Sequence, residues 1–252
     1  MVKKAVRKQK SALIIPLIIK TVCIIGVVIP AFFWWRRTHT PFVIMRSINE
    51  ETMLYKITGE YPVFTENLDE LNARVEKDIS NRVQEFKTQS DENWEDTKKF
   101  HTSDGVVPEF PNAPFTFTLQ YAPQQINRNF VSFVINMEWF TGGANMAQDY
   151  ATYNWDVQNN KPVSLKDLFI EDTYLSDVSK YVKATLFDQF QASGIEEQYI
   201  SKDMLDAGTA PIIENFLRFT FDDGSITFYF PKYQVAPGAS GPQKVKMPRV
   251  SR

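Results

Sequence analysis

Hydrophobic and polar residues follow two different periods along this chain. Apolar side chains recur every three or four residues over residues 68–86 and 174–191, the period of an amphipathic helix. Segments of strand character, several of them alternating between apolar and polar residues, predict strands over 54–64, 115–122, 128–140, 148–157, 215–221, 225–230 and 245–250. Because strands and helices segregate rather than alternate, the pattern predicts an α+β fold, with an antiparallel sheet and packed amphipathic helices.

Shorter signals mark the ends and connections of these elements. Asn67 and Glu70 have the spacing of a capping box at the start of the first helix. The polar run over residues 88–103 shows no clear period, so we expect a loop or a fraying helix end there. Further expected features are a strand turn at 124–127, a turn at 159–160, a helical turn at 164–169, a third helix over 196–207 and a hairpin at 222–224.

An apolar run near the N-terminus predicts a membrane anchor. Residues 13–35 read LIIPLIIKTVCIIGVVIPAFFWW, 23 residues with one charge, Lys20, which is long enough to cross a bilayer as a helix. The stronger basic flank lies on the N-terminal side, so we expect Met1 in the cytoplasm and the body outside. A cleaved signal peptide is the alternative, but no small-residue cleavage pattern follows the run.

The charge is distributed unevenly. The net charge of −2 hides eight bases and no acid in residues 1–37, against 20 bases and 30 acids afterwards, so the body carries about −10. Such a body repels nucleic acid and attracts basic proteins. The single cysteine, Cys23, lies inside the expected anchor, so the exported part holds no disulfide.

Residues that carry common catalytic chemistry are few. The only histidines are His39 and His101, so a multi-histidine zinc site is excluded, and we expect no metal site, no cofactor and no catalytic residue. Glu138, Asp149 and Asp156 are carboxylates near a glycine pair and would suit acid and base roles. Acids on the wet face of a sheet are more often simply solvated, which is the interpretation we favour.

The glycine pair in TGGANMAQDYATY has two interpretations. Gly142 and Gly143 follow one strand and precede another, so they suit a tight connection that needs positive φ. Alternatively this turn forms a recognition surface, since loops between rigid strands often carry binding residues. The candidate ligand-binding residues are Gly142, Gly143, Asn145, Tyr150 and Tyr153, with Tyr233 from the loop FPKYQVAPGASGP.

Three blocks resemble known bacterial families. YPVFTENLDELNARVEKDISNRVQEF (residues 61–86) is similar to the exported accessory domain of PdaC-type peptidoglycan deacetylases. TGGANMAQDYATYNWDVQNNKPVSLKDLF (141–169) and ITFYFPKYQVAPGASGP (226–242) resemble the C-terminal domain of RsiV-type anti-sigma factors, which sense lysozyme. The family's glycine turn commonly ends in histidine, whereas this chain has Asn145.

The resemblance implies a location and a general role. We expect a basic cytoplasmic tail (1–12), a transmembrane anchor (13–35), a stem (36–53), a PdaC-like accessory domain (54–140) and an RsiV-like domain (141–252). Only about a dozen residues precede the expected anchor, so we expect the cytoplasmic sigma-binding segment of RsiV-type proteins to be absent, and likewise the catalytic domain of PdaC-type proteins. We therefore expect a single-pass membrane protein of the bacterial envelope that is not an enzyme, and that binds lysozyme or a cell-wall ligand. The alternatives are a glycan-acting enzyme that uses surface carboxylates, and a scaffold for envelope proteins.

Overall fold

The computed structural model describes residues 42–65, 68–101, 109–143, 145–194 and 200–249. The expected anchor and tail, Asn67 of the expected capping box and the first residues of the expected third helix lie outside these ranges. Among the described helices, none combines the length and the apolar character that a membrane span requires.

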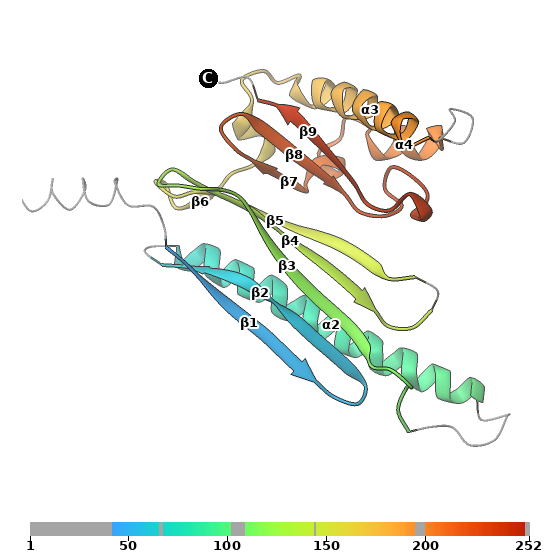
Figure 1. The fold of residues 1–252 in the computed structure, drawn as a ribbon. Coiled ribbons are helices and arrows are strands. Elements are labelled where there is room, and N and C mark those ends of the chain that lie inside the picture. Colours follow the sequence, from blue (N-terminus) through green and yellow to red (C-terminus); the bar gives the residue numbers. More distant parts are fainter. Residues whose placement is uncertain (1–41, 66–67, 102–108, 144, 195–199, 250–252) are drawn as a thin grey trace, which may run out of the picture. The chain divides into compact units, whose positions relative to one another are not determined.

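Six strands form the larger sheet, in the order β1-β2-β3-β4-β5-β6 (Figure 1). Its strands are β1 (Val43–Glu51), β2 (Tyr55–Phe64), β3 (Phe115–Ile126), β4 (Phe130–Phe140), β5 (Ala147–Asp156) and β6 (Lys161–Pro162). The expectation of a purely antiparallel sheet is wrong at one position, because β2 and β3 run parallel. A parallel pair needs a long crossover, which α2 (Asp69–His101) provides between these two strands.

Strand β1 corrects the expected stem. Residues 43–51 pair along their whole length with β2, from Val43 opposite Phe64 to Glu51 opposite Lys56. The alternation in this segment is weak because most of its side chains stay exposed, so composition alone suggested a linker.

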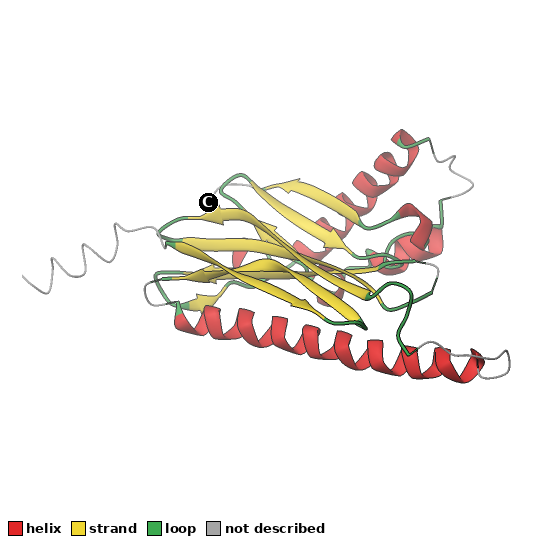
Figure 2. Ribbon diagram, turned by 60° about the horizontal axis from the view of Figure 1, so that its bottom comes forward, coloured by secondary structure: helices red, strands yellow, loops and turns green. Residues whose placement is uncertain are grey.

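Helix α2 covers one face of the larger sheet and is longer than expected (Figure 2). Its buried stripe runs from Leu71 through Phe86 and continues with Ser90, which is fully buried, and Trp94. The Trp94 indole N–H donates to the Glu109 carbonyl at 2.9 Å. Of the two expectations for residues 88–103, the loop is wrong and the helix instead continues to His101, because a serine occupies one position of the apolar stripe and hides its period.

The C-terminal part forms a second sheet and its own core. Strands β7 (Phe219–Phe221), β8 (Ser225–Phe230) and β9 (Gln243–Pro248) make an antiparallel sheet in that order. Helices α3 (Tyr174–Ala192) and α4 (Lys202–Gly208) and the short turns η1 (Leu165–Leu168), η3 (Ile213–Phe216) and η4 (Gly238–Ser240) complete this part. The expected helix over 174–191, the helical turn and the hairpin are confirmed, and the fold is mixed α+β.

Two buried polar side chains join the sheets. Asn154 on β5 donates from Nδ2 to the Phe219 carbonyl at 2.8 Å, and the Ser132 hydroxyl on β4 accepts the Phe221 N–H at 2.8 Å. The Ser132 hydroxyl in turn donates to Asn154 Oδ1 at 2.7 Å. These contacts satisfy the outer edge of β7, so the face of β4 that we expected to be partly wet is buried at Ser132.

Candidate functional site

The glycine pair forms the turn between β4 and β5. Gly142 and Gly143 have φ values of +96° and +97°, a region that side-chain-bearing residues rarely adopt. A Cβ at Gly143 would meet no atom within 4 Å, so the backbone angle and not crowding accounts for glycine here. The structural interpretation of the pair is confirmed, and Asn145 lies exposed in the same turn.

The two candidate tyrosines of β5 point to opposite faces of the sheet. Tyr153 faces α2, stacks on Phe133 at 4.9 Å between ring centroids and donates to Asp78. Tyr150 faces the second sheet and packs against Tyr229 at 5.1 Å. Burial raises the pKa of both hydroxyls, that of Tyr150 to about 12. The structure therefore does not bring these two side chains together at one surface.

The loop that holds Tyr233 lies beside the glycine turn. The Lys232 ammonium donates to the Met146 carbonyl at 3.0 Å, which connects the two loops. Tyr233 itself has φ +71°, is 65% exposed and lies against Gly238. This hydrogen bond is the contact that joins the two loops among the described residues, while Tyr150 and Tyr153 are buried on the two faces of the sheet.

The three candidate carboxylates do not form one cluster. Glu138 accepts a hydrogen bond from Asn136, and Asp156 accepts two from Asn159 in the following turn. Asp149 is 9% exposed, so the expectation that it is solvated is wrong. It lies between two guanidinium groups, Arg82 of α2 at 3.1 Å and Arg218 before β7 at 2.9 Å. This pairing ties α2 and the second sheet to β5.

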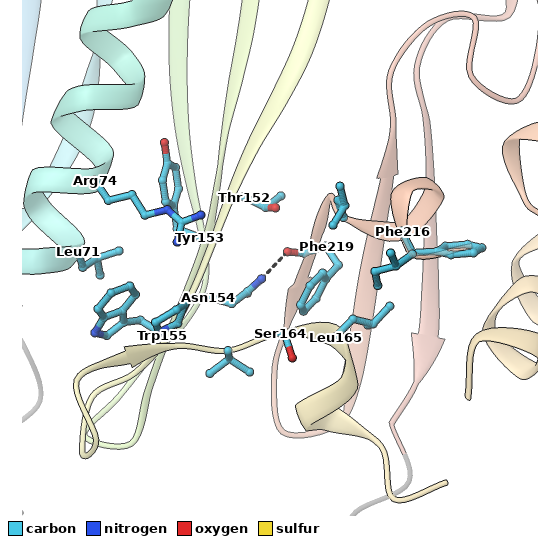
Figure 3. Close-up of a pocket in the computed structure, with 14 residues that line it drawn as sticks. Leu71, Arg74, Thr152, Tyr153, Asn154, Trp155, Ser164, Leu165, Phe216 and Phe219 are labelled. Atoms are coloured by element: carbon cyan, nitrogen blue, oxygen red, sulfur yellow. Dashed lines mark hydrogen bonds between the residues drawn. The ribbon is translucent and has the colours of Figure 1, made fainter. Parts of the chain in front are cut away.

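A cavity of about 280 Å³ lies beside β5, where sequence reasoning placed no site (Figure 3). Its lining comes from α2, from residues 152–155 of β5, from residues 162–165 at the end of β6 and after it, and from four residues ahead of and within β7, namely Ile213, Phe216, Leu217 and Phe219. Three of these four segments are remote from one another in sequence. Only the folded chain therefore assembles the cavity.

The walls of the cavity are mainly apolar. On the α2 side Leu71 and Trp155 are buried, and the Trp155 indole N–H donates to Asn160 Oδ1 at 3.1 Å. Asn160 has φ +48°, which confirms the positive-φ turn expected at this position. On the opposite side Phe216 and Phe219 are buried, while Leu217 at the rim is 58% exposed.

One backbone position of β5 is open toward the cavity. Asn154 accepts the Val163 N–H at 2.9 Å, so even-numbered residues of β5 direct their backbone groups away from β4. The next such N–H, at Tyr150, is bonded to Asp149 Oδ1 at 2.8 Å. Between them, the N–H and C=O of Thr152 have no hydrogen-bond partner among the described residues.

One cation completes the site. Arg74 extends from α2 along the Tyr153 side of the cavity (Figure 3). It forms no ion pair or hydrogen bond with any residue that the structure describes, in contrast to Arg82 two turns further along α2. The arrangement offers a ligand one hydrogen-bond donor, one acceptor and one positive charge between apolar walls. Among the described residues no group of three potential metal-ligating side chains occurs.

Two known families match successive parts of the chain. Residues 48–146 match the family described as "Deacetylase PdaC", and residues 166–249 match "Protein of unknown function (DUF3298)". The chain contains a PdaC-type domain and a DUF3298 domain. The cavity draws Leu71 and Arg74 from the PdaC-type domain and residues 213–219 from the DUF3298 domain, with β5 lying between the matched ranges.

A curated protein matches part of the chain. Peptidoglycan-N-acetylmuramic acid deacetylase PdaC of Bacillus subtilis (strain 168) is 33% identical over 116 residues, which is 46% of this chain and 24% of that protein. The chain thus spans about a quarter of the length of this curated relative. The family match and the name of this relative contradict our expectation that the protein is not an enzyme.

Solved structures of DUF3298 proteins share the fold. One from Bacteroides fragilis has a TM-score of 0.54 at 23% identity, covering 82% of this chain and 90% of its own. Another from Pseudomonas aeruginosa has a TM-score of 0.53 at 13% identity, covering 82% and 89%. The PdaC-type and DUF3298 domains indicate an envelope-related protein, whereas the resemblance to RsiV-type proteins stays a prediction.

Proposed function

We propose that this protein binds peptidoglycan at the bacterial cell envelope, and that the cavity beside β5 is the binding site. The observation that carries the proposal is the open Thr152 backbone between apolar walls, beside Arg74, which has no ion-pair partner in the part of the chain that the structure describes. The name of the Bacillus subtilis relative supports the choice of ligand, because that protein is a peptidoglycan deacetylase.

The dimensions of the cavity favour one unit of a polymer. Its volume of about 280 Å³ lies just below the range of roughly 300–1,000 Å³ that is usual for small-molecule sites. Such a site encloses a single sugar or amino-acid residue, while the rest of the polymer runs past the rim. Leu217, which is 58% exposed, supplies apolar contact at that rim.

Sedimentation with purified insoluble peptidoglycan tests this proposal. Leu217→Glu places a charge at the rim of the cavity. Ile44→Glu is the matched control: Ile44 is 51% exposed and lies on β1, at the edge of the larger sheet away from β5 and the cavity. We expect the full chain to sediment with peptidoglycan, Leu217→Glu to bind at least about tenfold more weakly, and Ile44→Glu to bind normally. Absence of binding by the unmodified chain, or equal loss in both variants, contradicts the proposal.

The same samples also report catalysis. Acetate released from the peptidoglycan during incubation measures deacetylation directly, as the PdaC-type match suggests. If the unmodified chain releases acetate and Leu217→Glu releases less, the reaction takes place at this cavity.

We propose a basic protein as a second type of partner, as for lysozyme-sensing proteins. The net charge of about −10 after residue 37 favours association with a cationic protein such as lysozyme. The affinity of such a complex falls as salt rises, because exposed charges are screened. A titration at low ionic strength that detects no complex with lysozyme excludes this partner.

A further inference from the structure

We propose that the cavity beside β5 recognises the carboxyl-terminal residue of an extended peptide, bound to the Thr152 backbone and to Arg74. The proposal rests on the proposed function and names the part of peptidoglycan that the site takes, namely its peptide and not its sugar. Each step depends on the geometry of β5, where one position of an edge strand is left open.

The open position has the length of a single residue. Asn154 on one side is paired with the segment after β6, and the Tyr150 N–H on the other side is bonded to Asp149. A strand added along the whole edge would have to displace the Asp149 carboxylate, which Arg82 and Arg218 hold in place. A ligand that leaves these contacts intact can pair only with Thr152.

Pairing with both groups of Thr152 defines the chemistry of the ligand. In an antiparallel ladder one residue exchanges two hydrogen bonds with the residue opposite, through the partner's own N–H and its own carbonyl oxygen. These two groups are separated by one carbon atom and belong to different amides. An amino-acid residue has this arrangement, whereas the single acetamido group of a sugar has its N–H and C=O on adjacent atoms, pointing in opposite directions.

The unpaired guanidinium indicates that this residue is the last of its chain. In a terminal residue the carbonyl oxygen that accepts the Thr152 N–H is part of a carboxylate, and the second oxygen is free for a cation. Arg74 lines the same cavity and has no ion-pair partner among the described residues. Charge-assisted hydrogen bonds of this type are about twice as strong as neutral ones.

The apolar walls fit the side chain of such a residue. In an extended residue the side chain projects across the line of the backbone, here toward either Trp155 on one side or Phe219 on the other. The small volume favours a short apolar side chain such as that of alanine.

Calorimetry with short probes tests the inference on the full chain. The probes are N-acetyl-Ala-Ala in its L,L and D,D forms, the corresponding carboxamides, and N-acetylglucosamine. We expect a free-acid dipeptide to bind, its carboxamide to bind at least about tenfold more weakly, and the sugar not to bind. Equal affinity for acid and carboxamide, or binding of the sugar alone, overturns the inference.

Two pairs of variants separate the two contacts. Arg74→Gln should abolish the preference for acid over carboxamide, and Lys77→Gln, an exposed position one turn along α2, should retain it. Thr152→Pro removes the N–H that points away from β4, at an edge position where proline is tolerated, and should abolish binding. Thr152→Val keeps that N–H and should bind normally.

The failures of the two proposals are distinguishable. If the chain sediments with peptidoglycan but binds no dipeptide acid, the inference about the peptide is wrong and peptidoglycan binding stands. If the chain does not sediment with peptidoglycan, the proposed function is wrong whatever the dipeptides show. If Thr152→Pro does not fold, as circular dichroism would reveal, Arg74→Gln still decides the carboxylate contact.

Discussion

The contact between the two sheets makes Ser132→Ala a demanding test of the fold. The Ser132 hydroxyl is fully buried and has two partners, Asn154 Oδ1 at 2.7 Å and the Phe221 N–H at 2.8 Å. Alanine keeps the backbone and nearly the same volume, but leaves one buried acceptor and one buried donor without a partner. Asn154 and Phe221 are themselves 8% and 0% exposed, so water has little access.

The expected cost follows from these two groups. Each unsatisfied buried polar group costs about 1–3 kcal/mol. Because the surroundings relax partly around the two groups, we expect their sum to lie in the lower half of its range, a loss of about 2–4 kcal/mol in the free energy of unfolding. A protein of this size has a total stability of about 5–15 kcal/mol, so the change is a large part of it.

Urea unfolding of the full chain, followed by tryptophan fluorescence, measures this loss. The midpoint should fall while the slope with urea stays unchanged, because the same surface is exposed on unfolding. Ser47→Ala is the matched control, since the Ser47 hydroxyl donates to Glu60 at 3.2 Å on the exposed surface of β1. We expect it to change stability by less than about 0.5 kcal/mol. If Ser132→Ala loses no more stability than this control, the conclusion that hydrogen bonds of Ser132 join the two sheets is refuted.

Three further predictions concern other parts of the chain. The Tyr121 hydroxyl is buried with no hydrogen-bond partner among the described residues, so Tyr121→Phe should leave stability unchanged or raise it by up to about 2 kcal/mol; a loss measured by urea unfolding contradicts this. Gly143→Ala should cost about 1–2 kcal/mol because φ is +97°, whereas Gly224→Ala, whose Cβ would lie 3.7 Å from the nearest atom, should be nearly neutral; equal thermal stability of both variants would show that the turn angle is not required. Burial raises the pKa of Asp222, but hydrogen bonds from the Ser225 hydroxyl and the Gly224 N–H outweigh it and hold the pKa below 3.8. Its carboxylate therefore stabilises the fold above about pH 4, and this contribution is lost as the pH falls through the folded pKa. Asp222→Asn should be less stable than the unmodified chain at pH 7, and the difference should shrink as the pH is lowered below about 4; a difference that stays constant with pH contradicts the assignment.

Local periodicity was sufficient for most elements of the fold. The stripe over 68–86, the helix over 174–191 and the strands near 115, 130, 148, 219 and 225 all occur within a few residues of their predicted positions. Their spacing records which side chains are buried on one face, and a neighbouring element hardly changes that pattern. The turn at the glycine pair was also predictable from local sequence, because glycine tolerates a positive φ wherever it occurs.

Predictions failed where a polar residue occupies a buried position, and where a strand buries too few apolar side chains to show a period. Ser90 interrupts the stripe of α2, so its last turns resembled a loop, and β1 exposes most of its side chains and resembled a stem. Ser132 lay on the face expected to be partly wet, yet its partner on β7 is 89 residues away in sequence. No local pattern reports such a partner.

The amino-acid sequence by itself determined most of the secondary structure, the acidic character of the body and the PdaC-like domain. The tertiary structure alone decided that β2 and β3 run parallel, that Asp149 is held between two arginines, and that a cavity opens beside Thr152. The physical reason is that a hydrogen-bond gap at a strand edge exists only after every neighbouring group has found its partner. Here those partners come from α2, β6 and the segment before β7, which only the folded chain brings together.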